Sequence, residues 1–192
     1  MHQFRMPLAA ALAAAAALAG CATEPVVAVS APATPATVAV MGATAGSFTA
    51  IDRDFALTAA ANNLLEIGAA QMARSRTSSP DVLSYASMLE QHHAAAHAEL
   101  TALMRARGVL PPSVVPYTMQ EVMNRLGTTR GGDFDRKFVA DVGLTAHASA
   151  ISTFQQQMPR LSDPELRAWA AKTLLVLQQH HAAAQQLAAQ VG

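Results

Sequence analysis

The chain of 192 residues has a single cysteine, Cys21. One thiol excludes a framework of internal disulfides, and the absence of a C-x-x-C-H motif excludes covalently attached haem. The sequence also lacks the G-x-S-x-G motif that places a nucleophilic serine on a sharp turn, so it does not favour a Ser-His-Asp hydrolase. Haem held by two histidines across a helical bundle stays open.

Charged residues are scarce and balanced, with 13 basic and 13 acidic side chains in the whole chain. Nucleic-acid binding normally requires a concentrated basic patch, and no segment supplies one. We therefore expect no nucleic-acid partner. The sequence does not identify a protein partner.

The chain has no hydrophobic run long enough to span a membrane. Its longest early run, residues 8–18, is shorter than the ~20 residues that a spanning helix needs. Arg5 precedes this run and Leu18-Ala19-Gly20-Cys21 ends it, a pattern that predicts a lipoprotein signal peptide over residues 1–21. The alternative is an ordinary secretory signal with an incidental cysteine.

Lipid attachment at Cys21 predicts a protein held on a membrane surface without a spanning segment. Ala22, in place of aspartate, resembles the sorting pattern of lipoproteins that reach the outer membrane. We therefore expect a cell-envelope protein on the outer membrane, facing the periplasm. Residues 22–46 are rich in Ala, Val, Thr and Pro and predict an extended tether before a single domain over residues 47–192.

The domain shows no alternating β pattern, and glycine and proline divide it into helical segments. Long helices are predicted over residues 51–76, 80–107 and 133–159 and from residue 162 onward. The sequence Ser78-Ser79-Pro80-Asp81 predicts a cap and a first-turn proline at the start of the second helix. A crossover between the second and third holds a short helix that starts at Thr118. Capping boxes are predicted at Thr118-x-x-Glu121 and Ser162-x-x-Glu165. This pattern predicts an all-α, four-helix ferritin-like bundle, with an up-down bundle of ordinary loops as the alternative.

Histidines are concentrated in the helices of the domain. Residues 89–100 read LEQHHAAAHAEL, and the hexapeptide QHHAAA occurs at residues 91–96 and again at 179–184. Helical periodicity places one histidine of each of three helices on the buried stripe. These are His93, His147 and His180, with His181 as the alternative to His180. The predicted stripe of the third helix also includes Leu144. That of the last helix consists of Leu166, Trp169, Thr173, Leu177, His180, Ala184 and Leu187.

Glu66 and Glu90 fall at nearly the same height along the predicted bundle as the histidines. Imidazole and carboxylate ligands together suit Zn, Fe or Mn, so the predicted metal ligands are His93, His147, His180, Glu66 and Glu90. The alternative is a structural polar layer in which core histidines bond to their neighbours. His92, His97 and Glu99 are expected on a solvated helix face.

A ferritin-type di-iron centre requires a Glu-x-x-His motif on each of two helices. Glu90-x-x-His93 supplies one, but Leu144 and Leu177 occupy the glutamate positions before the other two histidines. We therefore expect no ferroxidase activity. Whether the protein is an enzyme, such as an oxidase or peroxidase acting through a metal, stays open.

Several motifs resemble a family of bacterial envelope proteins that have a ferritin-like domain of unknown function and are often labelled outer membrane proteins. They are Asp54-Phe55, the Glu66 segment, Tyr85-Ala86-x-Met88 leading to His93, Gly132-Asp133-Phe134-Asp135 leading to His147, and Asp163-Pro164-x-Leu166 leading to His180. The resemblance implies the bundle and the same three histidines, but no reaction. The family pattern has an aspartate where this chain has His92.

The function expected from the sequence is therefore a lipid-anchored envelope protein with a histidine-rich core site, involved in metal binding and a stress-related role. The alternative is a non-catalytic structural or interaction module whose histidines form a hydrogen-bonded polar layer.

Overall fold

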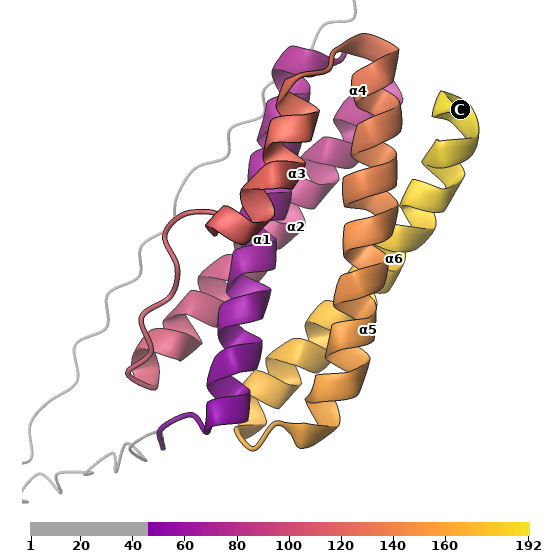
Figure 1. The fold of residues 1–192 in the computed structure, drawn as a ribbon. Coiled ribbons are helices and arrows are strands. Elements are labelled where there is room, and N and C mark those ends of the chain that lie inside the picture. Colours follow the sequence, from indigo (N-terminus) through magenta and orange to yellow (C-terminus); the bar gives the residue numbers. More distant parts are fainter. Residues whose placement is uncertain (1–45) are drawn as a thin grey trace, which may run out of the picture. The chain divides into compact units, whose positions relative to one another are not determined.

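The computed structural model describes residues 46–192, which form a helical bundle with no strand in that range (Figure 1). The predicted signal peptide, Cys21 and nearly all of the predicted tether lie outside the described residues. Within the part that is described, no helix combines the length and the hydropathy needed to cross a membrane.

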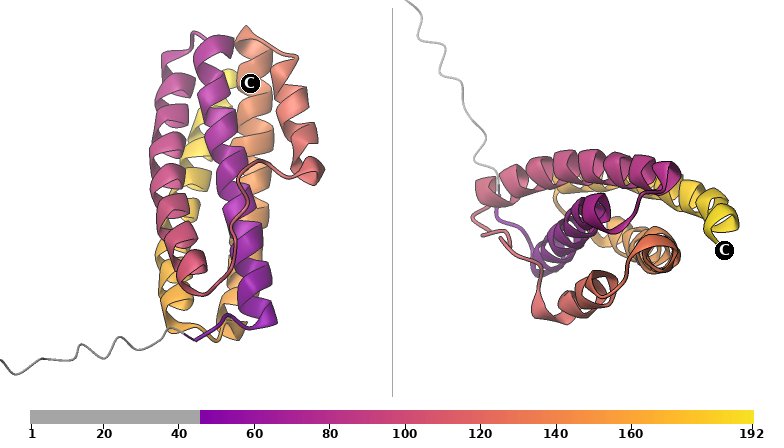
Figure 2. Two further views of the ribbon diagram at one scale, coloured as in Figure 1. Left: turned by 90° about the vertical axis from the view of Figure 1, so that its left-hand side faces the viewer. Right: turned by 90° about the horizontal axis from the view of Figure 1, so that it is seen from above.

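The helices follow one another with short connections, apart from a longer one after the second. They are α1 (Ala50–Arg76), α2 (Pro80–Ala106), α3 (Tyr117–Gly127), α4 (Gly131–Lys137), the π-helical segment η1 (Phe138–Ala146), α5 (His147–Gln157), the 3₁₀ turn η2 (Met158–Arg160) and α6 (Pro164–Val191). The first packs along the second, α2 along α6, and α6 along η1 and α5. The short helix α3 lies outside these, against α1 (Figure 2).

The start of α2 confirms the helix signal in the sequence. The Ser79 side chain accepts a hydrogen bond from the backbone N–H of Val82, and Pro80 occupies the first turn, where its missing N–H costs nothing. By contrast, the capping box predicted at Thr118 is wrong. The helix α3 begins one residue earlier, at Tyr117, and has no side-chain cap.

The capping box predicted at Ser162 is also wrong, because Asp163 caps α6. Its carboxylate accepts hydrogen bonds from the backbone N–H groups of Glu165 and Leu166. Pro164 explains the shift, since a proline favours the first helical position and keeps the residue before it extended. The cap must therefore be the residue directly before the proline.

The segment from α4 to η2 runs without a break, as predicted for residues 133–159, but it is not a regular α-helix. Its central part, η1, is π-helical, and it buries Val142 and Gly143, whereas Leu144 is only partly buried. A regular period of 3.6 residues predicts Leu144 on the buried stripe, and this prediction is wrong. A π turn inserts an extra residue, which moves the buried face back toward Val142 and Gly143.

The buried stripe predicted for α6 is confirmed at every position. All seven residues are buried: Leu166, Trp169, Thr173, Leu177, His180, Ala184 and Leu187. Of the two adjacent histidines, His180 is fully buried and His181 is only partly buried. The structure therefore identifies His180 as the histidine that faces the core.

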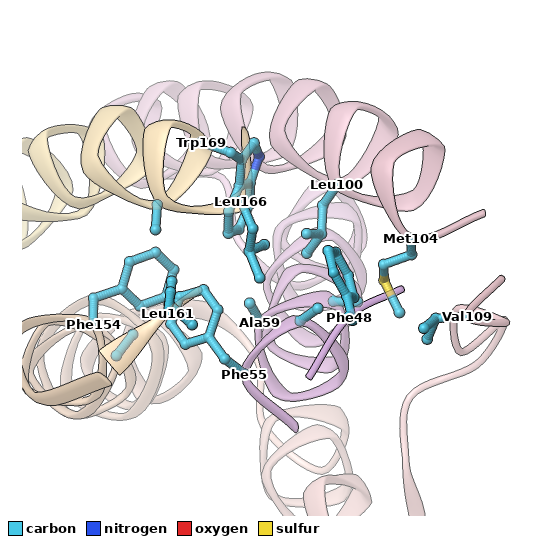
Figure 3. Close-up of a cluster of buried hydrophobic side chains, with 14 of the residues drawn as sticks. Phe48, Phe55, Ala59, Leu100, Met104, Val109, Phe154, Leu161, Leu166 and Trp169 are labelled. Atoms are coloured by element: carbon cyan, nitrogen blue, oxygen red, sulfur yellow. The ribbon is translucent and has the colours of Figure 1, made fainter. Parts of the chain in front are cut away.

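The core consists of two apolar clusters separated by polar side chains. One cluster lies where α1 and α6 begin, and its aromatic rings meet edge to face, with the Phe55 and Phe154 centroids 4.9 Å apart (Figure 3). The other lies toward the opposite ends of the same helices and includes Leu89 and Phe138. On each long helical segment, buried polar residues lie between the parts that belong to the two clusters. These residues form a polar layer that consists of Asn63, Glu66, His93, His147 and His180.

Gly143 allows η1 and α6 to approach closely beside this polar layer. A Cβ atom added to Gly143 would lie 2.8 Å from the Cβ of Ala184 and 3.2 Å from the hydroxyl of Tyr85. The same tyrosine hydroxyl donates a hydrogen bond to the backbone carbonyl of His180 at 3.2 Å. A side chain at position 143 would therefore push α6 and its histidine away.

We predict that Gly143→Ala lowers the free energy of unfolding by about 1–3 kcal/mol, because the extra methyl group meets another Cβ that cannot give way. Gly68→Ala is the matched control. A Cβ there would meet only the flexible end of Met123, at 3.1 Å. Gly68→Ala should stabilise the protein by about 0.5–1 kcal/mol through helix propensity. Urea unfolding of both variants measures the difference, and equal effects would contradict the close-packing argument.

Candidate functional site

Three buried histidines from three helices converge in the polar layer. His93 lies on α2, His147 is the first residue of α5, and His180 lies on α6. They are 4%, 0% and 0% exposed, and one ring nitrogen of each lies within 4.8 Å of one from each of the others. The structure therefore brings together the three histidines that the sequence selected.

The π-helical segment holds the His147 ring. Its Nδ1 is 2.8 Å from the backbone carbonyl oxygen of Val142, five residues earlier. A carbonyl can only accept, so Nδ1 carries the hydrogen and donates it, which leaves the lone pair on Nε2. The Glu66 carboxyl lies on the same side, with Oε1 3.5 Å from Nδ1. The ring therefore presents Nε2 toward the other histidines.

The hydrogen bonds then run in one direction from the surface to the core. The Nε2 of His147 is 3.1 Å from the Nδ1 of His180, whose own Nε2 is 2.8 Å from the Nδ1 of His92. Because Nε2 of His147 accepts, Nδ1 of His180 must donate, and its Nε2 must accept from His92. The donor and acceptor roles in this series of hydrogen bonds therefore all follow from the Val142 carbonyl at its buried end.

His93 is held differently and keeps one ring nitrogen free. Its Nδ1 is 2.9 Å from the Oδ1 of Asn63 on α1 and donates to it. Its Nε2 is buried and has no hydrogen-bond partner within residues 46–192. The same is true of Asn63 Nδ2 and Glu66 Oε2. Unpartnered buried polar atoms are unusual in native proteins, so three of them in one layer indicate a place for a bound water molecule or ion.

Burial keeps the three histidines neutral. It lowers the pKa of His147 to about 4. Burial also lowers the pKa of His180, to about 3, and repulsion from the protonated forms of His147 and His92 contributes to this shift. Burial lowers the pKa of His93 well below its usual value, and repulsion from the protonated forms of His147, His180 and His92 lowers it further. Neutral imidazole is the form that binds metal ions, so the three rings are in the form that a metal ion requires at neutral pH.

Two further groups in the layer are shifted in the opposite direction. Burial raises the pKa of Glu66 well above that of an ordinary glutamate. Burial also raises the pKa of Tyr85, and the neighbouring Glu66 raises it further. Burial therefore favours the uncharged form of both groups.

The two predicted carboxylates end in different places. Glu66 lies in the layer, but it faces the Nδ1 side of His147, away from the nitrogen that points to His180. Glu90 does not join the group. Its carboxylate forms an ion pair with Arg74 and accepts a hydrogen bond from Gln71 at 3.1 Å, both on α1. An ion bound by the three histidines would thus have Glu66 as a neighbour of one ligand and Glu90 at a distance.

Two residues that contact the histidines were not expected there. His92 is exposed, as predicted for a solvated face, but its ring also stacks on that of His180, with centroids 5.1 Å apart and 12° between the planes. Asn63 was not considered, although it lies three residues before Glu66 on the same side of α1, a spacing that could have revealed it. His92 contacts His180 from the outer side, and Asn63 accepts a hydrogen bond from His93.

Two hollows reach the group. A cavity of about 20 Å³ is lined by Asn63, Glu66, His93 and Thr173 among others, and it is large enough for one water molecule. A groove of about 140 Å³ between α2 and α6 has His92, His93 and His180 in its lining. The group is therefore buried within the bundle but close to the surface along one groove.

We predict that acid destabilises the protein through these histidines. The unfolded chain binds protons as the pH falls below 6.5, whereas the buried histidines stay neutral down to about pH 4 for His147 and about 3 for His180. The unfolded state then holds more protons, and the free energy of unfolding falls by up to about 1.4 kcal/mol per pH unit for each histidine. Glu66 opposes this above pH 4.5, because its raised pKa keeps the folded form protonated.

Urea unfolding at several pH values between about 7 and 5 tests this dependence. His180→Gln should make it shallower than in the unsubstituted protein, because one buried neutral histidine is removed. A free energy of unfolding that stays constant over this range would contradict the prediction.

A comparison with family models finds one match. The model described as "Domain of unknown function (DUF4142)" covers residues 37–187, which include the whole candidate site. No curated protein and no solved structure matches the chain. The chain therefore belongs to the family described as domain of unknown function DUF4142.

Proposed function

We propose that the protein binds a transition-metal ion, with His93, His147 and His180 as ligands. The observation that carries this proposal is the meeting of three buried, neutral imidazoles within 4.8 Å, one of which has an unpartnered Nε2. Three imidazoles suit Zn²⁺, Fe or Mn, and three protein ligands leave a coordination position for water or another ligand.

The distances fit an ion after a small adjustment. Two nitrogens bound to one tetrahedral Zn²⁺ lie about 3.3 Å apart, given Zn–N bonds of about 2.0–2.1 Å. The Nε2 of His147 and Nδ1 of His180 are already 3.1 Å apart. His93 has to move closer, since the group spans up to 4.8 Å. The Nε2 of His93 has no hydrogen bond to protein that such a movement would break, and the Asn63 side chain has to follow the ring to keep its bond to Nδ1.

The surroundings suit a metal centre as well. Histidine ligands usually donate their other ring N–H to a carbonyl, an amide or a carboxylate, which fixes the ring and its tautomer. His93 donates to Asn63, and His147 donates to Val142 with Glu66 beside it. Glu66 therefore has the position of a second-sphere partner of His147 in this proposal. Glu90 is left out of the ligand set, because Arg74 and Gln71 hold its carboxylate.

We further propose that the domain is a ferritin-like four-helix bundle, made by α1, α2, the continuous segment from α4 to η2, and α6. The packing of these segments and the position of α3 in the link after α2 support it. A di-iron centre of the ferritin type is not part of the proposal, since the second Glu-x-x-His motif is missing from the sequence.

The location we propose is the cell envelope, with lipid at Cys21 holding the domain on the outer membrane. The support is the sequence of residues 1–22 alone. A metal site in an exported domain is consistent with a role in metal handling under stress.

A different function remains the competing hypothesis, in which the polar layer is structural and the protein is an interaction module. The hydrogen bonds from His92 to His180 and from His180 to His147 support it, because they satisfy most of the ring nitrogens without any ion. The unpartnered Nε2 of His93 favours metal binding, since it offers a buried lone pair that no protein atom within residues 46–192 engages.

Metal analysis of the untagged protein separates the two functions. We expect about one equivalent of Zn²⁺, Fe²⁺ or Mn²⁺ at saturation, and a rise in melting temperature of about 5–10 °C when free metal exceeds Kd about 100-fold. The double substitution of His93 and His147 by alanine should abolish both. A matched control replaces His97 and His181, two histidines of α2 and α6 outside the group, and should change neither.

The proposal fails if the unsubstituted protein takes up none of the three ions and its melting temperature does not respond to them. It also fails if the control variant loses metal to the same extent as the site variant, because binding would then involve surface histidines.

A further inference from the structure

Two of the three proposed ligands are fully buried, so an ion can reach them only through an opening in the bundle. The cavity beside His93 and Glu66 is too small, at about 20 Å³, to pass a hydrated ion. The groove between α2 and α6 is larger, at about 140 Å³, and its lining includes both His93 and His180. This groove reaches two ligands of the group from the outside.

We propose that the groove between α2 and α6 is the route by which a metal ion reaches the three-histidine site, and that His92 closes it. This inference rests on the proposed metal binding. It names the part of the protein that controls loading and release of the ion.

His92 covers the outer edge of His180. Its Nδ1 is 2.8 Å from the Nε2 of His180, and the two rings stack almost in parallel. His92 itself is exposed and also lines the groove. Exposed side chains change rotamer within nanoseconds, so a single side-chain rotation uncovers His180 without any movement of a helix.

The direction of the hydrogen bonds makes His92 respond to loading. His180 carries its hydrogen on Nδ1 when it donates to His147, and Nδ1 is the atom that faces the site. A metal ion on Nδ1 requires the hydrogen to sit on Nε2 instead. Nε2 then donates, and the N–H of His92 can no longer point at it. His92 must turn away or present an acceptor, so it cannot keep its present hydrogen bond in the loaded protein.

The rim of the groove is suited to a cation. Lys172 on α6 lies at the groove, and its Nζ is 2.8 and 3.0 Å from the two oxygens of the Glu99 carboxylate on α2. Glu99 thus neutralises the one lysine in the lining. Ala95, on the α2 side, keeps the groove open because its side chain is a single methyl group.

Two neighbouring alanines provide a matched test of the route. Ala95 lines the groove, whereas Ala94 is exposed on α2 and does not line it. We expect Ala95→Trp to slow both association and dissociation of Co²⁺ about tenfold, with Kd little changed, because the indole fills the route but touches no ligand atom. Ala94→Trp should have the rates of the unsubstituted protein. Stopped-flow Co²⁺ absorbance gives the association rate, and displacement by excess EDTA gives the dissociation rate.

Two substitutions of His92 test the closure. His92→Ala removes the hydrogen bond that closes the empty site and should accelerate association roughly three- to tenfold, the effect of one bond of ordinary net strength. Dissociation begins from the loaded protein, which lacks this bond, and should change little. His92→Asn places an amide N–H near the position of Nδ1 and should restore slow association. A purely structural role for His92 would lower stability without changing the association rate.

Equal rates for Ala95→Trp, Ala94→Trp and the unsubstituted protein would overturn the route. An association rate in His92→Ala that matches that of the unsubstituted protein would overturn the closure by His92. Full binding with unchanged rates therefore refutes this inference and leaves the metal site intact. Absence of Co²⁺ and Zn²⁺ binding to the unsubstituted protein would refute the metal site and the route together.

Discussion

The hydrogen bond from His147 Nδ1 to the carbonyl of Val142 is the interaction on which the arrangement of the site depends. Because a carbonyl only accepts, it determines which nitrogen of His147 carries the hydrogen, and through it the tautomers of His180 and His92. The π-helical segment supplies that carbonyl and ends directly before His147. Interruptions of this kind are frequent at functional sites, and here a local change in winding orients a chain of three side chains.

The apolar clusters on either side of the polar layer explain how the bundle can tolerate buried imidazoles. Each long segment places its polar residue between two apolar clusters, and those clusters carry the hydrophobic stabilisation. Close approach at Gly143 lets α6 bring His180 next to His147. The cost of the layer is that its histidines must stay neutral and that some of its polar atoms stay unpartnered. A protein retains such a layer when the unpaired atoms serve a ligand or when the layer makes the packing specific.

Much of the fold could be predicted from the sequence, because helix periodicity and turn residues act locally. The buried stripe of α6 was correct at all seven positions, and the Ser79 cap of α2 was correct. The wrong assignments have local physical reasons. Pro164 moves the cap of α6 to Asp163, and the π turn moves the buried face from Leu144 to Val142 and Gly143. A single assumed period of 3.6 residues cannot represent the second case.

The sequence by itself determined that the described domain is helical and that His93 and His147 face inward, since both follow from patterns within single helices. It left the choice between His180 and His181 open, because both fit the stripe of α6, and the structure decided for His180. The tertiary structure decided which of the inward side chains meet, because that depends on how close and at what register the helices pack. It brought Asn63 and His92 to the histidines and left Glu90 with Arg74. It also decided that His93 keeps a free nitrogen, since only the packing of α1 against α2 places Asn63 at the other one.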